Sequence, residues 1–114
     1  MRPDDRVRIL HMIDAAEAID GFVAGRKRTD LDTDRMLLFA LVRATEIIGE
    51  AASKVSAETR AATDAVPWAQ ITAMRNRLIH AYFDIDHDVL WRTAMEEVPA
   101  LLLKLRPLAT DGRA

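Results

Sequence analysis

The chain has 114 residues, with 16 Lys and Arg against 18 Asp and Glu, a net charge of −2, and 50% apolar residues. These values indicate one small globular domain with one core, and they exclude collagen-like, disordered and disulfide-rich proteins. The absence of Cys excludes disulfides and thiolate metal sites, and it fits the reducing cytoplasm in which we expect the protein to reside. Charged residues interrupt the apolar positions of residues 1–21, so we expect neither a signal peptide nor a membrane span there. The slightly acidic balance excludes a general nucleic-acid coat but leaves a local basic cleft open.

The whole chain is predicted to be helical. It holds only 4 Gly and 4 Pro, and its apolar residues recur at every third or fourth position, so no segment is typical of a strand. The first predicted helix begins near Asp4 and Asp5, because acidic side chains are favourable at the positive end of a helix. Gly25 is expected to end it.

A loop and a second helix are predicted next. Residues 25–32 combine three consecutive cations with turn-forming residues, which indicates an exposed loop. Asp32 or Thr33 is expected to cap the second helix, over residues 34–55. The apolar residues of this helix cover more than one stripe, so it needs burial on two sides. Gly49 inside it favours a close helix crossing.

The second half of the chain is predicted to hold two more helices. Residues 56–66 form a connection with room for a short helix, and Pro67 then starts a third helix over residues 67–82. Asp86 is expected to cap the fourth helix, which should kink or restart at Pro99.

These elements predict an all-α fold, a four-to-five-helix up-and-down bundle. The two-sided apolar surface of the second helix makes a homodimer the simplest assembly. We expect a single domain over residues 1–108 and a frayed tail over residues 109–114.

The predicted third helix carries an unusual concentration of polar side chains in residues 74–82, MRNRLIHAY. At about 100° per residue, Arg75 and Tyr82 lie about 20° apart on one stripe, whereas Asn76 and His80 lie about 40° apart on another. Arg75 and His80 are about 140° apart, so their side chains must wrap around the helix, or a partner subunit must complete the site. A purely structural interpretation is equally open here, with Arg75 paired to an acidic residue of the second helix and His80 making one buried hydrogen bond.

The spacing Arg75, four residues, His80, one residue, Tyr82 resembles the R-x4-H-x-Y signature of HepT-like toxins, a branch of the HEPN-domain ribonucleases. Residues 34–52, the VPW before the third helix and the DIDHDVLW segment from Asp84 are also similar to that family. The resemblance implies a HEPN bundle that acts as a metal-independent endoribonuclease toxin, without a cofactor, and dimerises so that two motifs line one cleft. It also implies an MntA-type minimal nucleotidyltransferase as the antitoxin, which uses ATP to adenylylate the motif tyrosine, here Tyr82.

The residue types fit that chemistry independently. Metal-free RNA cleavage needs a base for the 2′-hydroxyl, an acid for the departing 5′-oxygen and a cation for the charge on phosphate. His80 can take or give a proton near neutral pH, and Arg75 can grip phosphate oxygens. A second His80 from a dimer could divide the base and acid roles. AMP on Tyr82 would add negative charge on the stripe of Arg75, and Asn76 could orient a phosphate or His80, or be a surface amide.

Other charged residues carry weaker hypotheses. Glu46 and Glu50 could be taken as an acid/base or metal pair, but Arg43 and Lys54 at helical spacing compensate them, so we assign no metal ligand. Glu46 could instead orient Arg75.

Four cations outside the R-x4-H-x-Y motif are candidates for RNA-phosphate contacts: Arg77, Arg26, Lys27 and Arg28. The last three form the basic loop, which could instead contact an acidic face of the antitoxin. The ordinary interpretation of this loop is that it is simply solvated. His11 and His87 are lone histidines with no role assigned.

Two alternatives stay open. The chain could be a non-catalytic HEPN subunit that binds a nucleotide or another partner for a nucleotidyltransferase, although the complete Arg75, His80 and Tyr82 set favours the enzyme. It could also be a dimeric scaffold with a coincidental motif.

Overall fold

The computed structural model describes residues 1–80 and 85–111, with the backbone alone for residues 75, 78–80 and 111. The described residues contain helices and no strand, as predicted. The elements are α1 (Pro3–Val23), α2 (Asp30–Thr33), α3 (Arg35–Ser53), α4 (Ala57–Ala62), α5 (Trp68–His80), α6 (His87–Arg92), the π-helix η1 (Thr93–Glu97) and α7 (Val98–Asp111).

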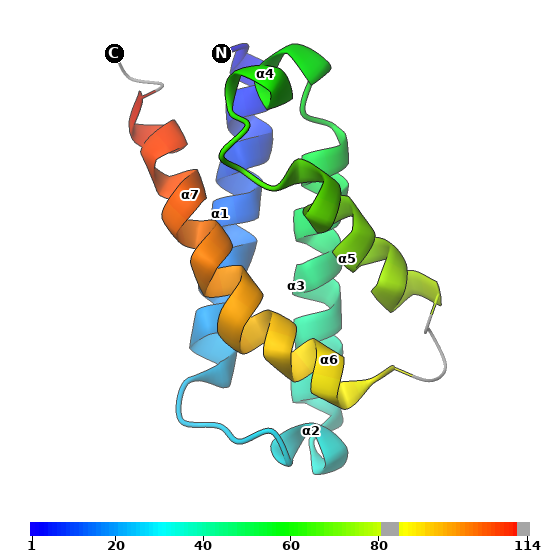
Figure 1. Cartoon of the computed structure of the whole chain (residues 1–114). Coiled ribbons are helices and arrows are strands. Elements are labelled where there is room, and N and C mark those ends of the chain that lie inside the picture. Colours follow the sequence, from blue (N-terminus) through cyan, green and yellow to red (C-terminus); the bar gives the residue numbers. More distant parts are fainter. Residues whose placement is uncertain (81–84, 112–114) are drawn as a thin grey trace.

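The long helices alternate in direction, which confirms the up-and-down bundle (Figure 1). α1 and α3 pack against each other along the centre, α7 packs on α1, and α5 packs on α3. The short helix α2 contacts α3 and α6 at one end of the bundle, and α4 lies at the other end, beside the start of α1. One continuous core of apolar side chains joins these helices.

The start of α3 corrects the sequence prediction. Residues 30–32, expected in the exposed loop, form α2 together with Thr33. The N-cap of α3 is Asp34, whose carboxylate accepts a hydrogen bond from the Leu37 amide at 3.1 Å. Asp32 and Thr33, the expected caps, therefore lie within α2. The reason is Leu31, which is 2% exposed and gives this polar segment an apolar anchor in the core. The first helix ends near Gly25 as expected: α1 ends at Val23, Ala24 is its C-cap, and Gly25 follows with a positive φ of 72° that favours glycine.

The predicted two-sided apolar surface of α3 is present. Leu37, Leu41 and Ile48 are buried in the core, and Gly49 is buried as well. On another side of the helix, Met36 and Phe39 are 83% and 54% exposed. One apolar side of α3 therefore faces the core of the chain while another faces outward.

The segments after residue 53 follow the prediction closely. α4 occupies the predicted connection, and α5 begins at Trp68, one residue after Pro67. The Asp86 carboxylate caps α6 by accepting from the Asp88 and Val89 amides at 2.9 and 3.1 Å. The helix restarts at Val98, beside Pro99, after the wider turn of η1. α7 runs to Asp111, so residues 109–111 of the expected tail are helical and residues 112–114 lie outside the described residues.

A buried carboxylate joins the start of α1 to α4. Asp5 is 3% exposed and accepts hydrogen bonds from the Ser56 amide at 2.9 Å and from the Ser56 and Thr59 hydroxyls at 2.6 Å each. The two hydroxyls, followed by the Ser56 amide, stabilise the charged form and lower the pKa of Asp5 from 3.8 to about 2. Asp5 is therefore an interhelical hydrogen-bond centre, in addition to its expected place in the first turn of α1.

Candidate functional site

The first half of the motif helix α5 is firmly held. Trp68, Ile71 and Met74 are buried, and α5 packs against α3. The Trp68 indole Nε1 donates a hydrogen bond toward the Thr63 carbonyl and hydroxyl oxygens, both at 3.2 Å. Since Thr63 follows α4, this bond fixes where α5 begins.

The second half of α5 carries the motif. The helix is continuous through His80, so the spacing argument applies to Arg75, Asn76 and His80 as predicted. Backbone position 75 lies about 40° around the axis from Ile71, within the arc that the buried residues Trp68, Ile71 and Met74 span, whereas position 80 lies about 180° from Ile71. Asn76, about 40° from position 80, is exposed. Tyr82, the third motif residue, lies outside the described residues.

The acidic residues of α3 are paired with a neighbouring cation. Arg43 Nη1 lies 3.6 Å from Glu46 Oε2 and 3.4 Å from Glu50 Oε1, so one guanidinium compensates both carboxylates. The Glu46 side chain is 26% exposed, less than that of Glu50 at 42%. Arg43 therefore compensates these carboxylates, as its helical spacing predicts.

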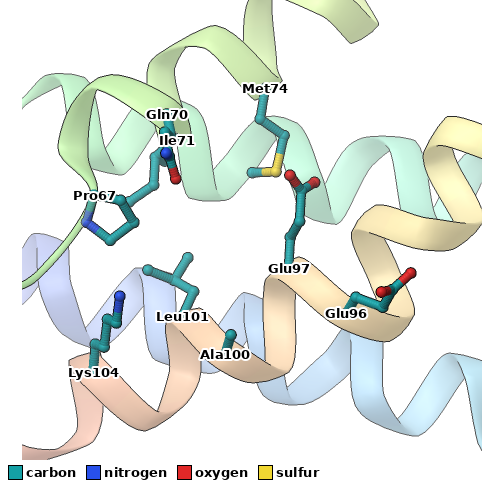
Figure 2. A pocket seen from close by; sticks show the side chains of 9 residues that line it. All are labelled: Pro67, Gln70, Ile71, Met74, Glu96, Glu97, Ala100, Leu101 and Lys104. Carbon is teal, nitrogen blue, oxygen red and sulfur yellow. The ribbon is translucent and has the colours of Figure 1, made fainter.

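A groove runs between α5 and the helical segment formed by η1 and α7. Its volume is about 270 Å³, and Figure 2 shows its lining side chains: Pro67, Gln70, Ile71, Met74, Glu96, Glu97, Ala100, Leu101 and Lys104. Its α5 and α7 sides are largely apolar, with Glu96 and Glu97 near the Met74 end and Lys104 near the Pro67 end (Figure 2). Arg77 of α5 reaches toward Glu97, with Nη2 3.9 Å from Oε2.

The basic loop before α2 is neutralised by aspartates. Arg26 Nε lies 3.3 Å from Asp30 Oδ2, and its Nη2 pairs with Asp34. These bonds contribute to lowering the pKa of both carboxyls, with the Lys27 amide as the first cause at Asp30 and Arg26 as the first cause at Asp34. The loop is therefore engaged in ion pairs within the chain.

Arg28 and His87 connect this loop to α6. Arg28 pairs with Asp32 at 2.9 Å and with Asp88, and His87 Nδ1 lies 2.8 Å from Asp32 Oδ1. The sequence analysis assigned His87 no role and missed this link. The bonded residues are far apart in the chain: His87 and Asp32 by 55 residues, and Arg28 and Asp88 by 60.

The described residues offer neither a cluster of metal ligands nor a membrane-spanning helix. Residues 1–80 and 85–111 contain no group of three or more His, Cys, Asp or Glu side chains arranged to hold a metal ion. No helix within these residues is both long enough and apolar enough to cross a bilayer.

An all-α bundle with R-x4-H-x-Y beginning on its third long helix has the architecture of a HEPN domain. The family model described as "Ribonuclease HepT-like" matches residues 12–108, and the chain belongs to this family. Three curated relatives agree. A protein named "Probable ribonuclease HepT" from Thermococcus cleftensis is 38% identical over 83% of this chain and 86% of its own length. A candidate RNase of Caldanaerobacter subterraneus is 37% identical, over 80% and 81% of the two chains, and a candidate RNase of Methanocaldococcus jannaschii is 32% identical, over 86% and 90%. No solved structure matches the chain.

Proposed function

We propose that the protein is a metal-independent endoribonuclease that acts as the toxin of a toxin-antitoxin pair. The observation that carries the proposal is the spacing of Arg75, His80 and Tyr82 in a chain that belongs to the HepT-like ribonuclease family. The names of the relatives, as ribonuclease HepT or as candidate RNases, support RNA as the substrate.

The reaction needs no group beyond the side chains and the RNA. A base removes the proton of a 2′-hydroxyl, and the 2′-oxygen attacks the adjacent phosphorus. The bond from phosphorus to the 5′-oxygen breaks, and an acid gives that oxygen a proton, leaving a 2′,3′-cyclic phosphate and a 5′-hydroxyl. We assign proton transfer to His80 and stabilisation of the phosphate charge to Arg75, as catalytic residues. An imidazole can serve as base or acid near neutral pH, and a guanidinium stays charged.

A homodimer would complete the site. Positions 75 and 80 lie about 140° apart on the continuous helix α5, so one copy does not bring them to one side of that helix. A second copy could supply a second His80, so that one histidine acts as base and the other as acid. The outward apolar side of α3, with Met36 at 83% and Phe39 at 54% exposure, supports association between copies.

The proposed antitoxin is an MntA-type nucleotidyltransferase that adenylylates Tyr82. The phenol oxygen would attack the α-phosphorus of ATP and release pyrophosphate, leaving AMP bonded to the tyrosine. If helical register continued to Tyr82, its position would fall about 20° from that of Arg75, so the added phosphate would compete with RNA for the guanidinium.

Supporting roles are assigned to residues near the motif. Asn76 is exposed and falls on the stripe of position 80, where it could orient a phosphate or His80. Glu46 lies on α3, against which α5 packs, and we assign it the orientation of Arg75. Arg77 is 55% exposed beside Glu97 and is a candidate phosphate contact.

The basic loop is a further candidate for phosphate contacts, through Arg26, Lys27 and Arg28. Arg26 and Arg28 would each have to exchange an aspartate partner for a phosphate.

RNA cleavage in EDTA by the purified protein tests the proposal. Wild-type protein should cut RNA, and Arg75→Ala and His80→Ala should remove the activity, by at least about a hundredfold for the loss of a general acid-base group. His11→Ala is the matched control, because His11 is an exposed histidine on α1 and should leave cleavage unchanged. Circular dichroism and the molar mass of each variant separate loss of chemistry from loss of the fold or of the dimer.

Cleavage that is absent in wild type, or equal in all variants, would contradict the enzyme and favour the non-catalytic nucleotide- or partner-binding subunit. A second arm incubates Tyr82→Phe and wild type with the antitoxin and ATP. Adenylylation of wild type alone would support Tyr82 as the modified residue, whereas labelling of Tyr82→Phe would exclude it.

A further inference from the structure

The groove between α5 and the η1–α7 segment has a wall of regular helical spacing on its α5 side. The lining residues of this wall are Pro67, Gln70, Ile71 and Met74, at positions i, i+3, i+4 and i+7. The Ile71 amide donates to the Pro67 carbonyl at 3.0 Å, so Pro67 belongs to the same helical turn. Residues at this spacing form one stripe along a helix, and this stripe is two turns long.

The opposite wall repeats the same spacing. Its lining residues at i, i+3, i+4 and i+7 are Glu97, Ala100, Leu101 and Lys104. Pro67 lies at the Lys104 end of the groove and Met74 at the Glu97 end (Figure 2). The two stripes are therefore of equal length and run in opposite directions.

The shape of the groove fits a third helix. A helix that lies in a groove between two others inserts side chains at the same i, i+3, i+4 and i+7 spacing. The buried residues Ile71, Met74 and Leu101 form an apolar floor, and the small, exposed Ala100 leaves room above it (Figure 2). The volume of about 270 Å³ lies below the range of about 300–1,000 Å³ that is typical of small-molecule sites. The groove therefore fits the side chains of a helix better than it fits a cofactor.

The two ends of the groove carry opposite charge. Among the described lining residues, Glu96 and Glu97 lie at the Met74 end, and Lys104 lies at the other end (Figure 2). The Glu97 carboxylate is held in place, because Oε2 lies 2.9 Å from the hydroxyl oxygen of the buried Thr93 and 3.9 Å from Arg77 Nη2. The Glu97 side chain is still 52% exposed, which leaves surface for a further cation. Two carboxylates would repel RNA phosphates, so the groove does not fit a nucleic acid.

The charged ends define the pattern of a complementary helix. Glu97 and Lys104 are seven residues apart, which is about 10 Å, or two turns, along a helix. A helix of the same length would place a basic side chain against Glu96 and Glu97 and an acidic side chain, two turns away, against Lys104. Two apolar side chains at i+3 and i+4 between them would face the floor.

We propose that the groove between α5 and the η1–α7 segment binds an amphipathic helix of a partner protein. That helix carries a basic, two apolar and an acidic residue at i, i+3, i+4 and i+7. The apolar side chains supply affinity, and the charged ends select the partner. This binding surface is distinct from the outward side of α3, and it does not depend on the proposed cleavage of RNA.

Binding of a synthetic peptide, followed by fluorescence anisotropy, tests the groove. The first peptide is labelled, held helical by a side-chain cross-link, and carries Lys, Leu, Leu and Glu at i, i+3, i+4 and i+7. Ala100→Trp fills the groove, and Ala61→Trp on α4 is the matched control, because both alanines are exposed residues of helices. We expect wild type and Ala61→Trp to bind the peptide alike. Ala100→Trp should bind it at least about tenfold more weakly, because the indole takes the space of a Leu side chain.

A second peptide, with Glu at both ends, tests the charges. It should bind wild type about fivefold more weakly than the first peptide, because a Glu then faces Glu96 and Glu97. In the double variant Glu96→Lys with Glu97→Lys, both ends of the groove are basic, and the order of the two peptides should reverse. Equal helicity by circular dichroism in all variants shows that the fold is retained.

The contrary outcomes are equally definite. No binding of the first peptide by wild type, or equal binding by Ala100→Trp and Ala61→Trp, would overturn the groove as a helix site. Equal affinity of wild type for the two peptides would overturn the proposed partner chemistry. If Ala100→Trp converted a wild-type dimer to monomer in light scattering, the occupant of the groove would be a second copy of this chain, and the partner helix would be excluded.

Discussion

The buried Asp5 carboxylate should make the stability of the bundle depend on pH in the acid range. Its pKa is lowered from 3.8 to about 2 by the hydroxyls of Ser56 and Thr59 and by the Ser56 amide. At about 1.36 kcal/mol per unit of pKa, this difference corresponds to about 2 kcal/mol of folding free energy. Because the folded pKa is the lower one, this stabilisation is fully present above the unfolded pKa and is lost as pH falls through about 4 toward 2.

The change to make is Asp5→Asn, with Asp4→Asn as the matched control. Both positions lie in the first turn of α1, so both changes remove one charge from the positive end of the helix, but Asp4 is exposed and Asp5 is 3% exposed. We expect Asp5→Asn to lower the free energy of unfolding at pH 7 by about 2 kcal/mol and Asp4→Asn by less than about 1 kcal/mol. Urea unfolding followed by circular dichroism between pH 7 and pH 2.5 measures both.

The difference between wild type and Asp5→Asn should shrink as pH falls below about 4, because Asp5 of the unfolded wild type then binds a proton while the folded carboxylate, with its pKa of about 2, still resists protonation. A difference that stays constant with pH would refute the argument, since the loss would come from packing or side-chain shape. Equal effects of Asp5→Asn and Asp4→Asn would refute it as well, because the helix dipole alone would then account for both.

Three further perturbations test the fold and the proposed dimer. Leu31→Ala should cost about 2 to 5 kcal/mol in urea unfolding, because the side chain is 2% exposed, whereas Leu103→Ala, at a position 71% exposed, should stay within about 0.5 kcal/mol; equal costs would mean that α2 is not anchored by Leu31. Asp34→Ala should lower the free energy of unfolding by about 1 kcal/mol, because α3 loses its N-cap. Asp34→Asn should keep most of the wild-type stability, because Asn can also cap a helix. An equal loss in both variants would mean that the exposed pair with Arg26 causes the effect. Met36→Lys with Phe39→Lys should leave helicity unchanged and convert the proposed dimer to monomer in light scattering, and a dimer that persists would exclude this side of α3 as its interface.

Periodicity and capping chemistry were sufficient to predict most of the helices. The helix end expected near Gly25, the helix start expected at Asp86 and the restart expected at Pro99 agree with the structure. Each depends on local backbone chemistry, which is a positive φ at Gly25, an N-cap carboxylate at Asp86 and a missing amide proton at Pro99. α2 was missed because its four residues have no helical period of their own. Only the burial of Leu31 distinguishes this segment from a loop, and burial is a property of the assembled core.

The motif was visible in the sequence, but its surroundings were not. The spacing of Arg75 and His80 needs only a continuous helix, and α5 provides it. The bond between Arg28 and Asp88 joins residues 60 apart, and no local pattern distinguishes Arg28 from Arg26. The pairing of each cation in the basic loop is set by how α2 and α6 meet, which only the tertiary structure specifies.

The chemical ends of the RNA fragments show how the phosphodiester bond is broken. Wild-type protein in EDTA should leave a 2′,3′-cyclic phosphate and a 5′-hydroxyl, because in the proposed reaction the 2′-oxygen attacks phosphorus while His80 transfers protons and Arg75 stabilises the phosphate charge. Mass spectrometry of a cleaved oligonucleotide distinguishes these ends, and His80→Ala should produce none while His11→Ala produces them at the wild-type rate. Fragments with 5′-phosphate and 3′-hydroxyl ends, or cyclic ends formed equally by His80→Ala, would contradict the proposed mechanism.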